Sequence, residues 1–139
     1  MVRTALLLVA TSALLISGIA QAGTASAKGA KAYIISPADG ATVSSPVKVQ
    51  FGLSGMGVAP AGTDKAKTGH HHLLINTSAP AMDKPIPKDA NHKHFGGGQT
   101  EAMLDLKPGK HTLQLLLGDK GHVPHSPAVL SKKITITVK

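Results

Sequence analysis

The chain has no cysteine and no tryptophan among its 139 residues. Without cysteine it cannot form disulfides, thiolate metal sites, iron–sulfur clusters or a thiol nucleophile. Its only aromatic residues are Tyr33, Phe51 and Phe95, too few for the stacking surfaces with which proteins bind single-stranded nucleic acid. The fold must therefore depend on packing and hydrogen bonds, and no nucleic acid is expected as a partner.

Acidic residues are also scarce, with 7 Asp or Glu against 15 Lys or Arg. Arg3 is the only charged residue among the first 22, so the rest of the chain carries 14 cations and 7 acids, a net charge of +7. The lysines are scattered and form no block of like charge. This spacing predicts a solvated surface rather than a basic interaction tail.

The first 22 residues have the pattern of a signal peptide. Arg3 supplies a positive start, an apolar run follows, and Ala20–Ala22 offers small residues for cleavage. We expect residues 1–22 to be removed, giving a chain that starts at Gly23, with Lys28 as a second possible start. The sequence thus predicts a periplasmic or secreted protein with no stable membrane span after leader cleavage.

Turn residues and alternating apolar residues predict an all-β domain, because Gly and Pro make up 24 of 139 residues and no segment has a helical period. The expected strands cover residues 32–35, 47–53, 70–75, 100–106, 111–117 and 134–138. We expect an antiparallel immunoglobulin-like β-sandwich of six to seven strands, in preference to a barrel, over residues 32–139. Residues 23–31, which are small and polar, are expected to be a flexible N-terminus.

Histidine is unusually abundant, and seven of the eight histidines lie in three clusters. The clusters are His70-His71-His72, His92-Lys93-His94 and His122-Val123-Pro124-His125. On a strand, residues i and i+2 share a face with Cα atoms about 6.5 Å apart, close enough for two imidazoles to bind one ion. His71 is in phase with the apolar residues Leu73 and Ile75, so His70 and His72 should project away from the core.

The His92–His94 cluster precedes a flexible glycine turn, and the His122–His125 cluster lies in a turn stiffened by proline. We expect the three clusters to meet at one end of the sandwich. The predicted metal ligands are His70, His72, His94, His122 and His125, and participation of His71 or His92 is left open. Imidazole suits Cu(II), Zn(II) and Ni(II), and Cu(II) binds most tightly in that series. We therefore expect copper(II) first and zinc second, with affinity falling from about pH 7.5 to about pH 5.5 as the imidazoles protonate.

His111 follows a Pro108-Gly109 turn, where sandwich domains often place a corner residue that hydrogen-bonds back to the backbone. Its phase with Leu113 and Leu115 points it toward the core. We therefore interpret His111 as a structural histidine rather than a metal ligand.

Signals for catalysis are weak. Asp119, His122 and Ser126 suggest a Ser-His-Asp triad, but no G-x-S-x-G motif is present. Gly96–Gly98 lacks the lysine and the strand-to-helix setting of a phosphate-binding loop. No enzymatic activity is predicted.

Three segments together resemble a family of small exported bacterial proteins, domain of unknown function 4399. They are Thr68–Ile75, His94–Glu101 and Gly118–His125. The resemblance spans about Ala32 to the end of the chain. It implies that the histidine-bearing segments belong to one compact exported domain, but it implies no activity.

Taken together, these features predict a periplasmic histidine-based protein that binds a divalent metal, copper(II) before zinc, for buffering or delivery. The alternative is a metal-independent immunoglobulin-like module. Such a module would bind an envelope protein or an anionic polymer through its positive surface.

Overall fold

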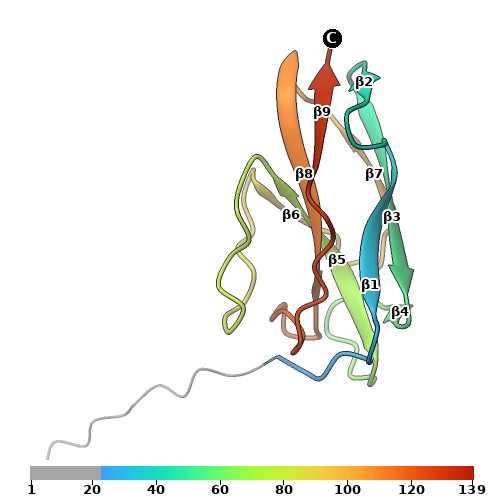
Figure 1. Ribbon diagram of the computed structural model, residues 1–139. Helices are drawn as coiled ribbons and strands as arrows, with labels where there is room; N and C mark the ends of the chain where they lie inside the picture. The colour runs from blue at the N-terminus through green and yellow to red at the C-terminus, as the bar shows by residue number, and fades with distance from the viewer. Residues whose placement is uncertain (1–22) are drawn as a thin grey trace, which may run out of the picture.

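The computed structural model describes residues 23–139, which form two β-sheets packed against each other without any helix in that range (Figure 1). The strands are β1 (Lys31–Ser36), β2 (Thr42–Val43), β3 (Val47–Ser54), β4 (Gly57–Val58), β5 (Thr68–Ile75), β6 (His92–His94), β7 (Glu101–Leu104), β8 (Gly109–Gly118) and β9 (Ile134–Val138). The smaller sheet has the order β1-β3-β7. The larger has the order β2-β9-β8-β5-β4, and β6 pairs with β5.

The expected all-β sandwich is confirmed, with more strands than the six to seven predicted. The three additional strands, β2, β4 and β6, are two or three residues long, too short to show an alternating pattern. The β2–β9 and β4–β5 pairs are parallel, whereas all other pairs between named strands are antiparallel. The predicted signal peptide, residues 1–22, lies outside the described residues. Within residues 23–139, no helix is long and apolar enough to span a membrane.

The main core lies between the two sheets and is filled by alternate residues of the strands. Leu73 and Ile75 on β5 and Leu113, Leu115 and Leu117 on β8 are almost fully buried there. Strands β5 and β8 pair from His70↔Gly118 to Ile75↔Leu113. This register places their core residues side by side, as expected for paired strands that share one buried face.

A second, smaller apolar cluster covers the opposite face of the same two strands. It contains Leu74, Leu116 and Ile86, and Ile86 comes from the long connection between β5 and β6. The backbone N–H of Ile86 also donates to the carbonyl of His122 over 2.8 Å. The outer face of β5 is therefore buried as well, beneath the segment of residues 76–91 that extends beside the sheet in Figure 1.

The segment before β1 hydrogen-bonds to the rest of the domain, although the sequence predicts a flexible N-terminus over residues 23–31. Thr24 donates its N–H to Asp119 Oδ2 over 3.0 Å and accepts at its carbonyl from the N–H of Ser126, also at 3.0 Å. Ala25 forms a parallel β-bridge with Ser126, and Ser26 Oγ donates to the carbonyl of Pro127. Small residues permit this close approach of one backbone to another.

His111 occupies the expected corner between residues 107 and 112. Its Nδ1 lies 2.9 Å from the Asn76 Nδ2 donor, which leaves Nε2 to donate to the carbonyl of Lys107 over 2.7 Å. Its role as a hydrogen-bonded structural histidine is confirmed. Its predicted position in the core is wrong, because the side chain is only partly buried near the start of β8.

Candidate metal centre

Strand β5 supplies two histidines on one face, as the i, i+2 spacing predicts. His71 lies on the other face against Phe51, with ring centroids 5.3 Å apart. His70 and His72 therefore project away from the main core, as expected. They are nevertheless only 1% exposed, because the segment containing Ile86 covers this face. The sequence did not predict this burial, because it does not reveal that a long connection folds back over its own strand.

Strand β6 supplies the third histidine. His94 pairs directly with His72 in the antiparallel register of β5 and β6, and directly opposed side chains in such a pair lie on the same face. The two rings have centroids 5.0 Å apart. Only three residues of β6 pair with β5, and this pairing is sufficient to place His94 at the site.

The turn after β8 supplies the fourth histidine. His122 has a φ of 67°, a left-handed conformation that a residue with a side chain rarely adopts. Its N–H donates to the carbonyl of Asp119, and its own carbonyl accepts from Ile86. Such backbone strain is held by surrounding contacts and is frequent at functional sites.

Asp119 organises this turn, a role that the sequence did not predict. Its Oδ1 accepts from the N–H groups of Gly121 and Val123, and its Oδ2 accepts from Thr24. Burial by itself raises the pKa of Asp119, but these three backbone donors outweigh burial and lower the pKa below its ordinary value. The only signal in the sequence is an Asp-Lys-Gly turn shortly before His122, and its partner Thr24 lies 95 positions away.

Gly118, which pairs with His70 across β5 and β8, leaves room for the site. A Cβ at this position would lie 2.8 Å from His72 Nε2 and 3.5 Å from the Cα of His122. A distance below about 3.0 Å is not tolerated by real Cβ atoms. A larger residue at this position would therefore have to displace the His72 ring.

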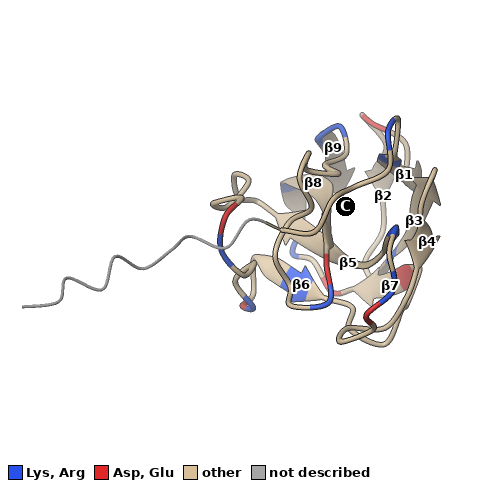
Figure 2. Ribbon diagram, turned by 90° about the horizontal axis from the view of Figure 1, so that it is seen from below, with Lys and Arg blue, Asp and Glu red and all other residues tan. Residues whose placement is uncertain are grey.

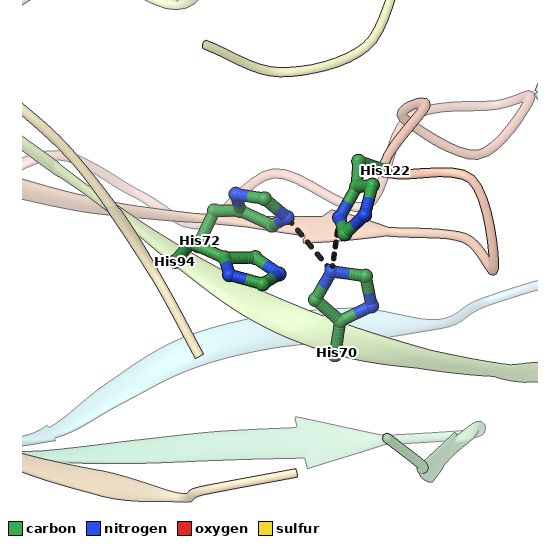
Figure 3. Close-up of side chains that lie close together, drawn as sticks. All are labelled: His70, His72, His94 and His122. Carbon is green, nitrogen blue, oxygen red and sulfur yellow. Dashed lines mark hydrogen bonds between the residues drawn. The ribbon is translucent and has the colours of Figure 1, made fainter. Parts of the chain in front are cut away.

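The structure brings His70, His72, His94 and His122 together (Figure 3). One ligand atom from each lies within 4.8 Å of all the others. His70 Nε2 is central, at 3.0 Å from His72 Nε2 and 3.1 Å from His122 Nδ1. Segments separated by up to 52 residues thus place four imidazoles around one point.

In three of these four histidines, the neutral imidazole is favoured over the protonated form. Burial, followed by the repulsion of His122 and His94, lowers the pKa of His70 from 6.5 to about 4. Burial, followed by the repulsion of His70 and His94, lowers the pKa of His72 to about 3. The pKa of His94 is lowered by burial and by the charges of His122 and Lys88. Their lone pairs are available to a cation without removal of a proton.

The spacing of the ring nitrogens is close to that of a metal centre. Four nitrogens around an ion at about 2.0–2.1 Å lie roughly 3.3 Å apart in a tetrahedron, and two pairs here lie at 3.0 and 3.1 Å. His94 Nε2 and His72 Nδ1 are buried without a hydrogen-bond partner, which costs free energy. A cation at the centre would replace the hydrogen bonds that join His70 Nε2 to His72 Nε2 and His122 Nδ1.

The other histidines lie outside this group. His125, a predicted ligand, is 2% exposed and its Nε2 lies 3.0 Å from the carbonyl of Thr68. His92 hydrogen-bonds through Nδ1 to Asp89, and His71 faces Phe51. The suggested triad is not formed, because the oxygens of Asp119 accept from backbone N–H groups and not from an imidazole.

Comparison with known proteins identifies the family of this chain. A family model described as Domain of unknown function (DUF4399) matches residues 49–139, a range that contains all four clustered histidines. No curated protein and no solved structure matches the chain. The immunoglobulin-like character, bacterial origin and export expected from the sequence stay predictions. With a match over more than half of its length, the chain belongs to the DUF4399 family.

Proposed function

We propose that this protein binds a divalent transition metal through His70, His72, His94 and His122, and that it buffers or delivers the ion in the periplasm or outside the cell. The observation that carries this proposal is the convergence of four imidazoles from three segments within 4.8 Å. Chance exposure of histidines does not produce a buried group with lowered pKa values. A preorganised set of neutral donors favours reversible binding of an ion.

Copper(II) is the proposed ion, with zinc second. The four donors are all imidazole nitrogens, which suit Cu(II) and Zn(II), and Cu(II) has the higher intrinsic affinity. No thiolate exists in the chain, and no methionine is among the four donors. An exported protein also meets copper in its oxidised state.

The metal-independent alternative has weaker support in the structure. In Figure 2 the Lys and Arg segments of residues 23–139 are separated by uncharged segments and by acidic ones. Lys48 pairs with Glu101 and Lys120 pairs with Asp64. We retain this alternative as the outcome to be accepted if metal binding fails.

The test is calorimetric titration of the metal-free protein with Cu(II) and with Zn(II). One ion should bind per chain, and His72→Ala should reduce its affinity by at least about tenfold, a loss of about 1.4 kcal/mol. His92→Ala is the matched control, because His92 lies on the same strand as His94 but outside the group, and it should bind normally. Binding no tighter than that of an unstructured His-rich peptide would refute the proposal.

A further inference from the structure

A cavity of about 170 Å³ opens directly onto the four-histidine site. Its lining residues are His72, Pro85, Ile86, Lys88, His94 and His122. Three of the four imidazoles thus border the cavity, and His70 does not. An ion held by the group would be accessible from this side and have room there for one more ligand.

The four-histidine group contains no negative charge. All four donors are neutral when they bind an ion, so a divalent cation would keep its full charge where His70 and His72 are 1% exposed. Burial of a charge is costly unless it is paired. Asp119 follows β8 directly, but both of its oxygens already accept backbone N–H groups, so it cannot become a ligand without releasing the turn.

The cavity beside the ion has the composition of an anion site. Lys88 adds a positive charge to its lining, and Pro85 and Ile86 form its apolar part. An apolar lining lowers the local dielectric and strengthens the attraction between opposite charges. Ile86 is itself held in place by Leu74 and Leu116 and by its hydrogen bond to His122, so the cavity is bounded by a packed segment.

We propose that the metal-loaded protein binds one small free anion in this cavity, as an additional ligand of the ion and beside Lys88. This inference rests on the proposed metal function. The ligand class is a monovalent anion of a few non-hydrogen atoms, such as formate, chloride or azide. The anion offsets the charge of the ion, and its release provides an open position through which the ion can be passed to another ligand.

The experiment uses the Cu(II)-loaded protein and sodium azide as the probe. Azide bound to Cu(II) gives a charge-transfer absorption band, which should saturate at one azide per copper, and formate should displace it. Lys88→Ala should weaken azide binding by about fivefold, as expected for loss of one nearby exposed charge. It should not lower Cu(II) affinity, because the charge of Lys88 opposes positive charge at His94. Lys84→Ala is the matched control in the same segment and should bind azide normally.

The outcomes separate this inference from the proposed function. Tight Cu(II) binding without a saturable azide band, or with equal azide affinity in the Lys88 and Lys84 variants, would overturn the anion site and leave metal binding intact. Displacement of azide by polyglutamate would overturn a free anion as the occupant, because it would show that the site accepts a carboxylate on a protein chain. Absence of Cu(II) binding would refute both.

Discussion

At the scale of single residues, three consecutive histidines have two different environments. His70 and His72 face other imidazoles, whereas His71 is fully buried on the opposite face of β5. Both ring nitrogens of His71 lack a hydrogen-bond partner, and burial lowers its pKa to about 4. Alternation along a strand therefore separates the candidate metal donors from a histidine that is packed in the core.

Replacement of His71 by leucine should stabilise the metal-free protein. The variant removes two unpaired ring nitrogens and places an apolar side chain against Phe51. The free energy of unfolding at pH 7 should therefore rise by about 1–2 kcal/mol. Cu(II) affinity should stay unchanged, because His71 points away from the four-histidine site. Chemical denaturation and calorimetry measure the two quantities. A loss of stability, or of metal affinity, would show that the His71 ring has a partner.

At the scale of elements, the site depends on segments that come from distant parts of the chain. The N-terminal segment binds Asp119, Asp119 shapes the turn that carries His122, and the carbonyl of His122 binds the segment with Ile86. Each link has a backbone N–H as its donor, and the Asp119 carboxylate accepts two of the three, so patterns of apolar residues do not reveal them. The histidine pattern could be recognised along the sequence, but the connections that bring the clusters together could not.

Removal of residues 23–27 should weaken metal binding through His122. The shortened chain, which starts at Lys28, loses the Thr24 donor to Asp119 and the Ala25–Ser126 bridge. We expect about a fivefold to tenfold loss of Cu(II) affinity, corresponding to one lost charge-assisted hydrogen bond. Calorimetric titration of the chains that start at Gly23 and at Lys28 measures this difference in Cu(II) affinity.

A double-mutant cycle with His122→Ala provides the control for this deletion. If the segment acts by positioning His122, the deletion should have little further effect on Cu(II) affinity once that imidazole is absent. An equal loss of affinity with and without His122 would indicate general destabilisation instead. The Cu(II) absorption spectrum of the shortened chain should also shift toward that of His122→Ala.

At the scale of the whole molecule, the sandwich encloses ionisable groups that must stay neutral. The pKa values of His70, His71 and His72 are lowered to about 4, 4 and 3, mainly by burial. In the unfolded chain these groups bind protons near pH 6.5. The unfolded state therefore binds more protons than the folded state between about pH 6.5 and 4.

Acid should consequently destabilise the metal-free protein in that window. The contribution of the buried histidines to the free energy of unfolding is fully present above about pH 6.5. It is lost as the pH falls toward the pKa values of these histidines in the folded protein. Each histidine that stays neutral in the folded protein adds at most about 1.4 kcal/mol per pH unit to the slope of the free energy of unfolding against pH. Denaturant titrations from pH 7.5 to pH 4.5 measure this dependence, and His71→Leu should make it shallower. A flat profile would contradict the burial of the three rings.

The pH dependence of metal binding should also differ from that expected of exposed histidines. At pH 5.5 the buried His70 and His72 of the folded protein are still neutral, so protons compete less with the ion. Between pH 7.5 and 5.5, Cu(II) affinity should fall less for the protein than for a synthetic peptide of residues 68–75, whose imidazoles titrate near pH 6.5. Calorimetry at both pH values compares them. Equal losses would mean that the site is not preorganised.

The sequence by itself determined the all-β class, most strand positions, the corner histidine and the face of β5 from which His70 and His72 project. These features depend on alternation and turn residues, which are local properties of the chain. Only the tertiary structure decided that Ile86 buries this face, that Gly23–Ser26 docks on Asp119, and that His122 rather than His125 lies beside His70. The physical reason is that such contacts join residues far apart in sequence through single hydrogen bonds and covering loops, and neither leaves a periodic pattern in the amino acids.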